Sequence, residues 1–185
     1  MNPSLTRTDW LDAGLRLIGE RGPASLRIDV LCRTLGVTKG SFYHHFGGQP
    51  EYVTALLAHW KNTYTQQLIH AVADIGDLRQ RSKRLSELAL GKDMRPEVAL
   101  RAWAMSDAEV ASTVQAVDTQ RLQYLRDLAQ SMGLPLARAN LSAQMAYAQL
   151  IGIQHLSALI TPQDAALMDE TLAAALLTSS VEPRP

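Results

Sequence analysis

Apolar residues recur along this chain at intervals of three and four positions, which is the spacing of an amphipathic α-helix. We expect Thr8 to cap a first helix and Gly22 to end it. The buried face of that helix is predicted to carry Leu11, Leu15 and Ile18. Alternating runs of β-branched residues, which would predict strands, are nearly absent. The pattern therefore predicts an all-α fold.

A second helical pattern runs from Leu26 to Leu35 and stops at Gly36, because a glycine can adopt the left-handed conformation of a C-cap. Cys32, the single cysteine, falls on the apolar face, so we expect a buried core residue and not a redox group. Thr38 is expected to cap the next helix with its hydroxyl. Two helices joined by so short a glycine turn form a helix-turn-helix.

The short second helix of this motif has one apolar face, formed by Phe42 and Phe46, because successive residues lie about 100° apart around a helix. Small or hydrogen-bonding side chains remain on its open face, where they could read base edges in a DNA major groove. These are Gly40, Ser41, His44 and His45. Lys39 and Tyr43 flank the open face and are placed for phosphate oxygens, so the helix is predicted to read DNA.

The segment from Thr8 to about Trp60 resembles the N-terminal DNA-binding domain of TetR-type (tetracycline-repressor-like) transcriptional regulators, most specifically over residues 35–46. The resemblance implies three N-terminal helices, a long fourth helix, and a helical domain that binds a ligand and dimerises. It implies DNA contacts for Thr38, Lys39, Gly40, Ser41, Tyr43, His44 and His45. The family often opens its second helix with two threonines, where this chain has Leu26 and Arg27, so Arg27 is the expected phosphate contact there. Gln49 stands where a lysine is frequent.

The chain divides on this reasoning into a helix-turn-helix domain, residues 1–48, and a helical effector-binding and dimerisation domain, residues 49–185. Gln49 is expected to cap a long helix from Pro50 to about Ala73. Further predicted helices start at Pro96 and span residues 109–132, 136–160 and 163–179, followed by a disordered tail at 181–185.

Seven side chains of the second domain are candidates to line the small-molecule pocket that the resemblance implies. They are Trp60, Tyr64, Trp103, Met105, Tyr124, Tyr147 and His155. The alternative for each is ordinary core packing, since aromatic residues at helical spacing usually just pack.

The predicted helix 136–160 is apolar on more than one face and carries the small residues Ala148 and Gly152, which would let a second chain approach closely. We therefore predict a homodimer through the last two helices; the alternative is the central helix of a monomer. A two-fold dimer would present its two reader helices to successive major grooves of double-stranded DNA, so the operator is expected to be an inverted repeat.

Charge adds little, because Lys plus Arg and Asp plus Glu both number 18. No serine elbow, phosphate loop or spaced Cys/His set is present, so we expect no catalytic residues, no metal site and no cofactor. A polar N-terminus argues against a secretory signal. Inside the long uncharged stretch, Asn140, Gln144, Gln149, Gln154 and His155 argue against a membrane span, which predicts a cytoplasmic protein. The competing function is a helical ligand-binding or protein-interaction module that binds no operator.

Overall fold

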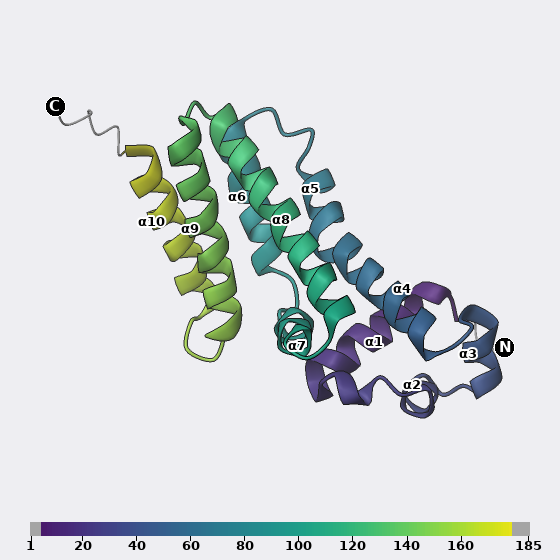
Figure 1. Cartoon of the computed structure of the whole chain (residues 1–185). Coiled ribbons are helices and arrows are strands. Elements are labelled where there is room, and N and C mark those ends of the chain that lie inside the picture. The colour runs from purple at the N-terminus through teal and green to yellow at the C-terminus, as the bar shows by residue number, and fades with distance from the viewer. Residues whose placement is uncertain (1–4, 179–185) are drawn as a thin grey trace. The chain divides into compact units, whose positions relative to one another are not determined.

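All regular secondary structure is helical in residues 5–178, which are the residues that the computed structural model describes (Figure 1). This confirms the all-α prediction, while the predicted tail at 181–185 lies outside the described residues. The chain forms two compact units, Met1–Gln67 with Asp93–Val117 and Leu68–Lys92 with Asp118–Pro185. The predicted functional boundary at residue 48 falls inside the first unit and stays a prediction.

The first unit begins with α1 (Arg7–Arg21), which is capped by Thr6 and not by Thr8. The Thr6 hydroxyl accepts a hydrogen bond from the Asp9 N–H at 3.2 Å, and the Asp9 carboxylate accepts one from the Thr6 N–H at 2.7 Å. This reciprocal pair is a capping box, and its threonine-to-acid spacing was readable in the sequence. Thr8 lies one residue inside the first turn of the helix.

The helix-turn-helix consists of α2 (Ile28–Leu35) and α3 (Lys39–His45), preceded by the 3₁₀ turn η1 (Pro23–Ser25). Gly36 ends α2 with φ 68° and ψ 33°, which confirms the left-handed C-cap. Thr38 occupies the N-cap position of α3, as predicted, but its hydroxyl makes no capping hydrogen bond. The Ser41 N–H instead donates to the Thr38 carbonyl at 3.1 Å, so the expected role of the hydroxyl was wrong.

Four buried aromatic side chains hold α1, α3 and α4 (Gln49–Lys61) together. Phe42 packs edge-on against Trp10 with ring centroids 5.5 Å apart, and Phe46 packs at 90° against Tyr52 at 5.0 Å. The Tyr52 hydroxyl donates to the Trp10 carbonyl at 2.8 Å. Each of the four side chains is at most 1% exposed, which confirms the predicted inward face of Phe42 and Phe46. Cys32 is also buried, as predicted.

The predicted long helix from Pro50 to about Ala73 is interrupted. Gly48, not Gln49, is its N-cap, and the Gln49 side chain instead donates to the Leu26 carbonyl. After α4 the chain makes a π-helical turn, η2 (Asn62–Gln66), and continues as α5 (Gln67–Ala71). Asn, Thr and Tyr have weak helix propensity, and a threonine hydroxyl competes for helix carbonyls, which explains why an uninterrupted α-helix is not favoured here.

The rest of the first unit consists of α7 (Arg95–Ala104) and the first half of α8 (Ala108–Ser131). Helix α7 packs closely on α1 at Gly19, where an added Cβ would lie 2.9 Å from the Pro96 nitrogen. Any side chain at this position would therefore push the two helices apart.

The second unit contains α6 (Leu78–Leu90), the second half of α8, α9 (Leu136–His155) and α10 (Pro162–Thr178). Helix α9 ends at His155 and not near residue 160, and residues 156–159 form turns. Lys83 of α6 pairs with Glu170 of α10 at 3.2 Å, and the Tyr147 hydroxyl of α9 donates to Asp118 of α8 at 2.6 Å.

We predict that Phe42→Ala lowers the free energy of unfolding by about 3–5 kcal/mol, because it removes a fully buried ring and leaves a cavity. Urea denaturation followed by circular dichroism measures the change. Tyr43→Ala is the matched control: this neighbouring ring is 56% exposed, so its loss should change stability by less than about 1 kcal/mol. Equal losses for the two variants would contradict the assigned core.

Candidate functional site

Helix α3 presents a polar face to solvent. Lys39, Gly40, Tyr43 and His44 are exposed, whereas Ser41 and His45 are half-buried. The rings of His44 and His45 pack edge-on, with ring centroids 5.1 Å apart and ring planes at 76°. The face therefore offers a short row of small and hydrogen-bonding groups on a helix that is backed by the aromatic core. Such a surface can enter a groove in which base edges present donors and acceptors.

Two positively charged side chains flank this face, and only one of them is in an ion pair within residues 5–178. Lys39 is exposed and makes no ion pair among the described residues, so its charge is available to an anion. Arg27 occupies the N-cap position of α2, is 71% exposed, and pairs with Asp29 at 3.1 Å. Burial would raise the pKa of Asp29, but the nearby charges of Arg27 and Arg33 outweigh burial and lower it. Arg27 is thus partly neutralised where Lys39 is not.

The C-terminal end of α3 is braced by Arg7 and Glu51, two residues that sequence reasoning missed. Arg7 donates to the His45 carbonyl and to the Glu51 carboxylate, both at 3.3 Å, and its guanidinium lies 4.7 Å from the Phe46 ring centroid. Glu51 in turn accepts a hydrogen bond from the Gly47 N–H at 2.8 Å. The partners are far apart in sequence, so no local pattern indicates this brace. Its effect is to fix the end of α3 to α1 and α4.

Four of the seven predicted pocket residues belong to the first unit. Trp60 is fully buried, and Tyr64 and Trp103 are half-buried against the same core. Met105, just beyond α7, is 88% exposed. Burial, followed by the negative charges of Asp93, Glu97 and Asp12, raises the pKa of Tyr64 to about 12. Tyr64 therefore stays protonated at neutral pH, and two of the nearby carboxylates are paired with cations, Asp93 with Arg95 and Glu97 with Arg101.

The other three predicted pocket residues belong to the second unit. Tyr147 is buried, donates to Asp118 at 2.6 Å, and accepts from Arg121 at 3.3 Å, so its hydroxyl has partners inside the unit. Tyr124 is half-buried on α8, and His155 is exposed with a ring nitrogen 2.9 Å from the Ile151 carbonyl. The hydrogen bonds of Tyr147 favour a packing role for that residue. Ligand contact remains a prediction for the remaining members of the set.

None of the helices in residues 5–178 is both long and apolar enough to cross a membrane. No group of three or more His, Cys, Asp or Glu side chains in the same residues is arranged to hold a metal ion.

Comparison with known proteins gives a consistent result. Residues 11–51, which contain α2 and α3, match the family model described as bacterial regulatory proteins, tetR family. The chain is similar to the HTH-type transcriptional regulator BetI of Brucella anthropi, with 25% identity over 118 residues. That match covers 64% of this chain and 59% of the relative, so the chain spans less than two thirds of that protein's length.

Solved structures show the same fold. A TetR-family transcriptional regulator of Rhodococcus sp. superimposes with a TM-score of 0.76 at 20% identity, covering 93% of this chain and 98% of that one. A transcriptional regulator of Saccharomonospora viridis, solved in complex with choline, superimposes with a TM-score of 0.75 at 18% identity, covering 96% of this chain and 98% of that one.

Proposed function

Since the chain belongs to the TetR family of transcriptional regulators, we propose that it is a homodimeric repressor that leaves an inverted-repeat operator when a small molecule binds. Members of this family are regulators and not enzymes. The observation that carries the proposal is the exposed polar face of α3, held from behind by Phe42 and Phe46 and at its end by Arg7. A helix so braced can enter a groove without being reshaped.

Within this proposal the contacts to DNA divide into two kinds. Lys39, Tyr43 and Arg27 contact phosphates, as does the Thr38 hydroxyl, which makes no capping hydrogen bond. Gly40, Ser41, His44 and His45 face base edges, and the half-buried state of Ser41 and His45 places them at the margin of the face. Phosphate contacts set position and affinity, whereas base-edge contacts select the sequence.

We predict that Lys39→Ala weakens binding to all duplexes alike and reduces the slope of log affinity against log salt by about one, because one phosphate contact is lost. Ser41→Ala should leave that slope unchanged and alter the preferred sequence. Fluorescence anisotropy at several salt concentrations, with operator and scrambled duplexes, measures both. Binding that is insensitive to salt would instead favour a protein-interaction module without operator binding.

Helices α9 and α10 supply the support for a dimer. Large apolar side chains are exposed along them, including Leu141 at 47%, Met145 at 42% and Leu167 at 63%. Ala148 is exposed, and a Cβ added at Gly152 would meet no atom within 4 Å, so no residue among 5–178 covers that part of α9. A second copy of the chain would bury this surface and pair the two α3 helices about 34–36 Å apart on DNA.

We predict that Met145→Glu converts the dimer into a monomer, because it places an unpaired charge in an apolar interface. Sedimentation equilibrium at micromolar concentration measures the mass, and operator affinity should fall in parallel. Gln130→Glu is the control: it introduces the same charge at an exposed position of α8, outside the surface of α9 and α10, and should leave the dimer intact. A wild-type protein of single-chain mass under these conditions would remove the dimer proposal.

The effector is proposed to bind beside Tyr64, where aromatic rings and carboxylates come together in the first unit. Trp60 and Trp103 belong to the same core, and Glu97, almost fully buried, pairs with Arg101 at 3.0 Å. Aromatic faces attract organic cations. The similarly folded regulator solved with choline makes choline the first compound to test.

We predict that millimolar choline raises the melting temperature of the protein by a few degrees, since a ligand that binds only the native state stabilises it. The same choline should weaken operator binding. Tyr64→Ala should abolish the thermal shift, whereas Tyr43→Ala, on the surface of α3, should retain it. A shift that persists in Tyr64→Ala would place the ligand elsewhere, and binding that left operator affinity unchanged would contradict the coupling.

We propose that effector binding is coupled to operator release by a population shift. The two helix-turn-helix domains of the dimer exchange between two spacings, only one of which matches the operator. The effector binds the mismatched state more tightly and so draws the population toward it. Tilting of the helical connection that begins at Pro50 exchanges the two states.

A further inference from the structure

The hydrogen-bond register changes at η2, the turn that follows α4. The Asn62 N–H donates to the Ala58 carbonyl four residues back, as in an α-helix, whereas the Gln67 N–H donates to the Asn62 carbonyl five residues back. The turn η2 therefore accommodates one residue more than an α-helix of the same length. Such π-helical turns are rare and occur frequently at functional sites.

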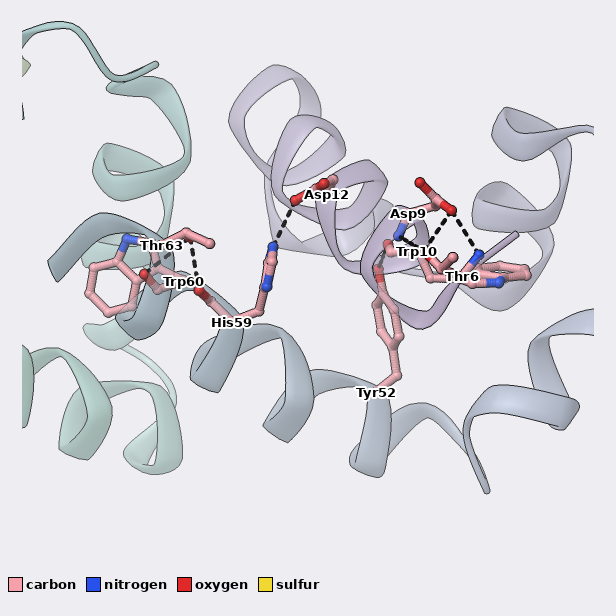
Figure 2. Close-up of polar contacts among 8 residues, drawn as sticks. All are labelled: Thr6, Asp9, Trp10, Asp12, Tyr52, His59, Trp60 and Thr63. Atoms are coloured by element: carbon pink, nitrogen blue, oxygen red, sulfur yellow. Dashed lines mark hydrogen bonds and ion pairs between the residues drawn. The ribbon is translucent and has the colours of Figure 1, made fainter. Parts of the chain in front are cut away.

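Thr63 adds a side-chain hydrogen bond at this turn. Its hydroxyl donates to the His59 carbonyl at 2.8 Å and approaches the Trp60 carbonyl at 3.5 Å (Figure 2). The His59 carbonyl also accepts from the Asn62 N–H, so it has a side-chain and a backbone donor at the start of the turn. Tyr64, the residue to which we assign effector contact, is the next residue of the same turn. The residue proposed to contact the effector is therefore next in sequence to the residue whose hydroxyl bonds at the start of the turn.

His59 of α4 links this turn to α1. The His59 ring reaches from α4 to Asp12, with Nε2 2.7 Å from the carboxylate oxygen Oδ1 (Figure 2). Because an ionised carboxylate only accepts, Nε2 carries the hydrogen in this bond. The His59 side chain is 12% exposed and that of Asp12 is 52% exposed, so α4 contributes the enclosed partner. His59 thus contacts α1 through its ring and the Thr63 hydroxyl through its backbone carbonyl.

We propose that η2 is a two-state register switch for operator binding, with Thr63 holding the π form and His59 transmitting its state to α1. Resolving the π turn into α-helix turns the residues on its two sides by about 100° relative to one another. In the π form the two helix-turn-helix domains of the dimer have the spacing of the operator. In the α form they do not. This inference rests on the proposed operator binding and names the element that the effector acts on.

The test compares Thr63→Ala with Thr113→Ala. Thr113 makes the same hydroxyl bond to the carbonyl four residues back, at 3.1 Å to Glu109, but lies in the regular helix α8. Thr63→Ala removes the bond that supports the π form and adds a strong α-former. We expect its operator affinity to fall threefold or more, while affinity for a scrambled duplex stays unchanged. Thr113→Ala should match the wild type for both duplexes.

Deleting Gln66, an exposed residue of the turn, supplies a second variant. The deletion removes the extra residue, so an α-helix forms with both flanks still facing as they do now. Operator affinity should stay within about twofold of wild type, and adding Thr63→Ala to the deletion should have no further effect. The drop caused by Thr63→Ala should also shrink in a His59→Leu background but persist with His59→Gln, whose amide nitrogen can replace Nε2.

The outcomes separate the two proposals. A wild-type protein that binds no promoter fragment from its own genome overturns the proposed function. A wild type that binds its operator, together with Thr63→Ala and Thr113→Ala variants of equal operator affinity and equal melting temperature, overturns the register switch alone. A rise in operator affinity for Thr63→Ala would overturn the assignment of the π form to the operator-bound state.

Discussion

The interaction on which the structure depends is the burial of Trp10, Phe42, Phe46 and Tyr52 in one aromatic cluster. These four rings come from α1, from α3 and its end, and from α4, and the Tyr52 hydroxyl adds a hydrogen bond to the Trp10 carbonyl. A helix as short as α3 is marginal by itself, because helix nucleation is costly. The cluster supplies the tertiary packing that keeps α3 helical. The polar face of α3 is therefore presented to solvent only because the opposite face is packed.

The same cluster decides what can move. Arg7 and Glu51 join α1 to α4 near the end of α3, and His59 and Asp12 join the same two helices further along. With both ends of the α1–α4 contact tied and the rings between them buried, α1 and α3 follow α4 as one body. The reader helix therefore moves together with α4 and with α7, which packs on α1 at Gly19, and η2 is the interruption that follows α4.

Sequence reasoning succeeded where the signal was local. The C-cap at Gly36 follows from the freedom of glycine at positive φ, and the inward face of α3 follows from the four-residue spacing of Phe42 and Phe46. It failed where the deciding partner was distant or where two backbone states compete. Arg7 contacts the residue 38 positions along the chain, and the π turn follows from a balance between propensity and a threonine hydroxyl, which periodicity does not register. The misplaced cap at Thr8 was a different failure, since the box at Thr6 and Asp9 was present in the sequence.

A switch of this kind requires the two registers to lie close in free energy, and two features of the turn bring them closer. Asn62, Thr63 and Thr65 weaken the α form, and the Thr63 hydroxyl bonds to the His59 carbonyl at the start of the turn. An effector can move such an equilibrium only by its differential affinity for the two states, and a tenfold difference corresponds to about 1.4 kcal/mol. One lost hydroxyl bond is of the same order, about 0.5–1.5 kcal/mol, so a contact at Tyr64 and a bond at Thr63 act on one scale. That match in magnitude is what allows a small ligand to reverse the preference of the turn without disturbing the aromatic cluster.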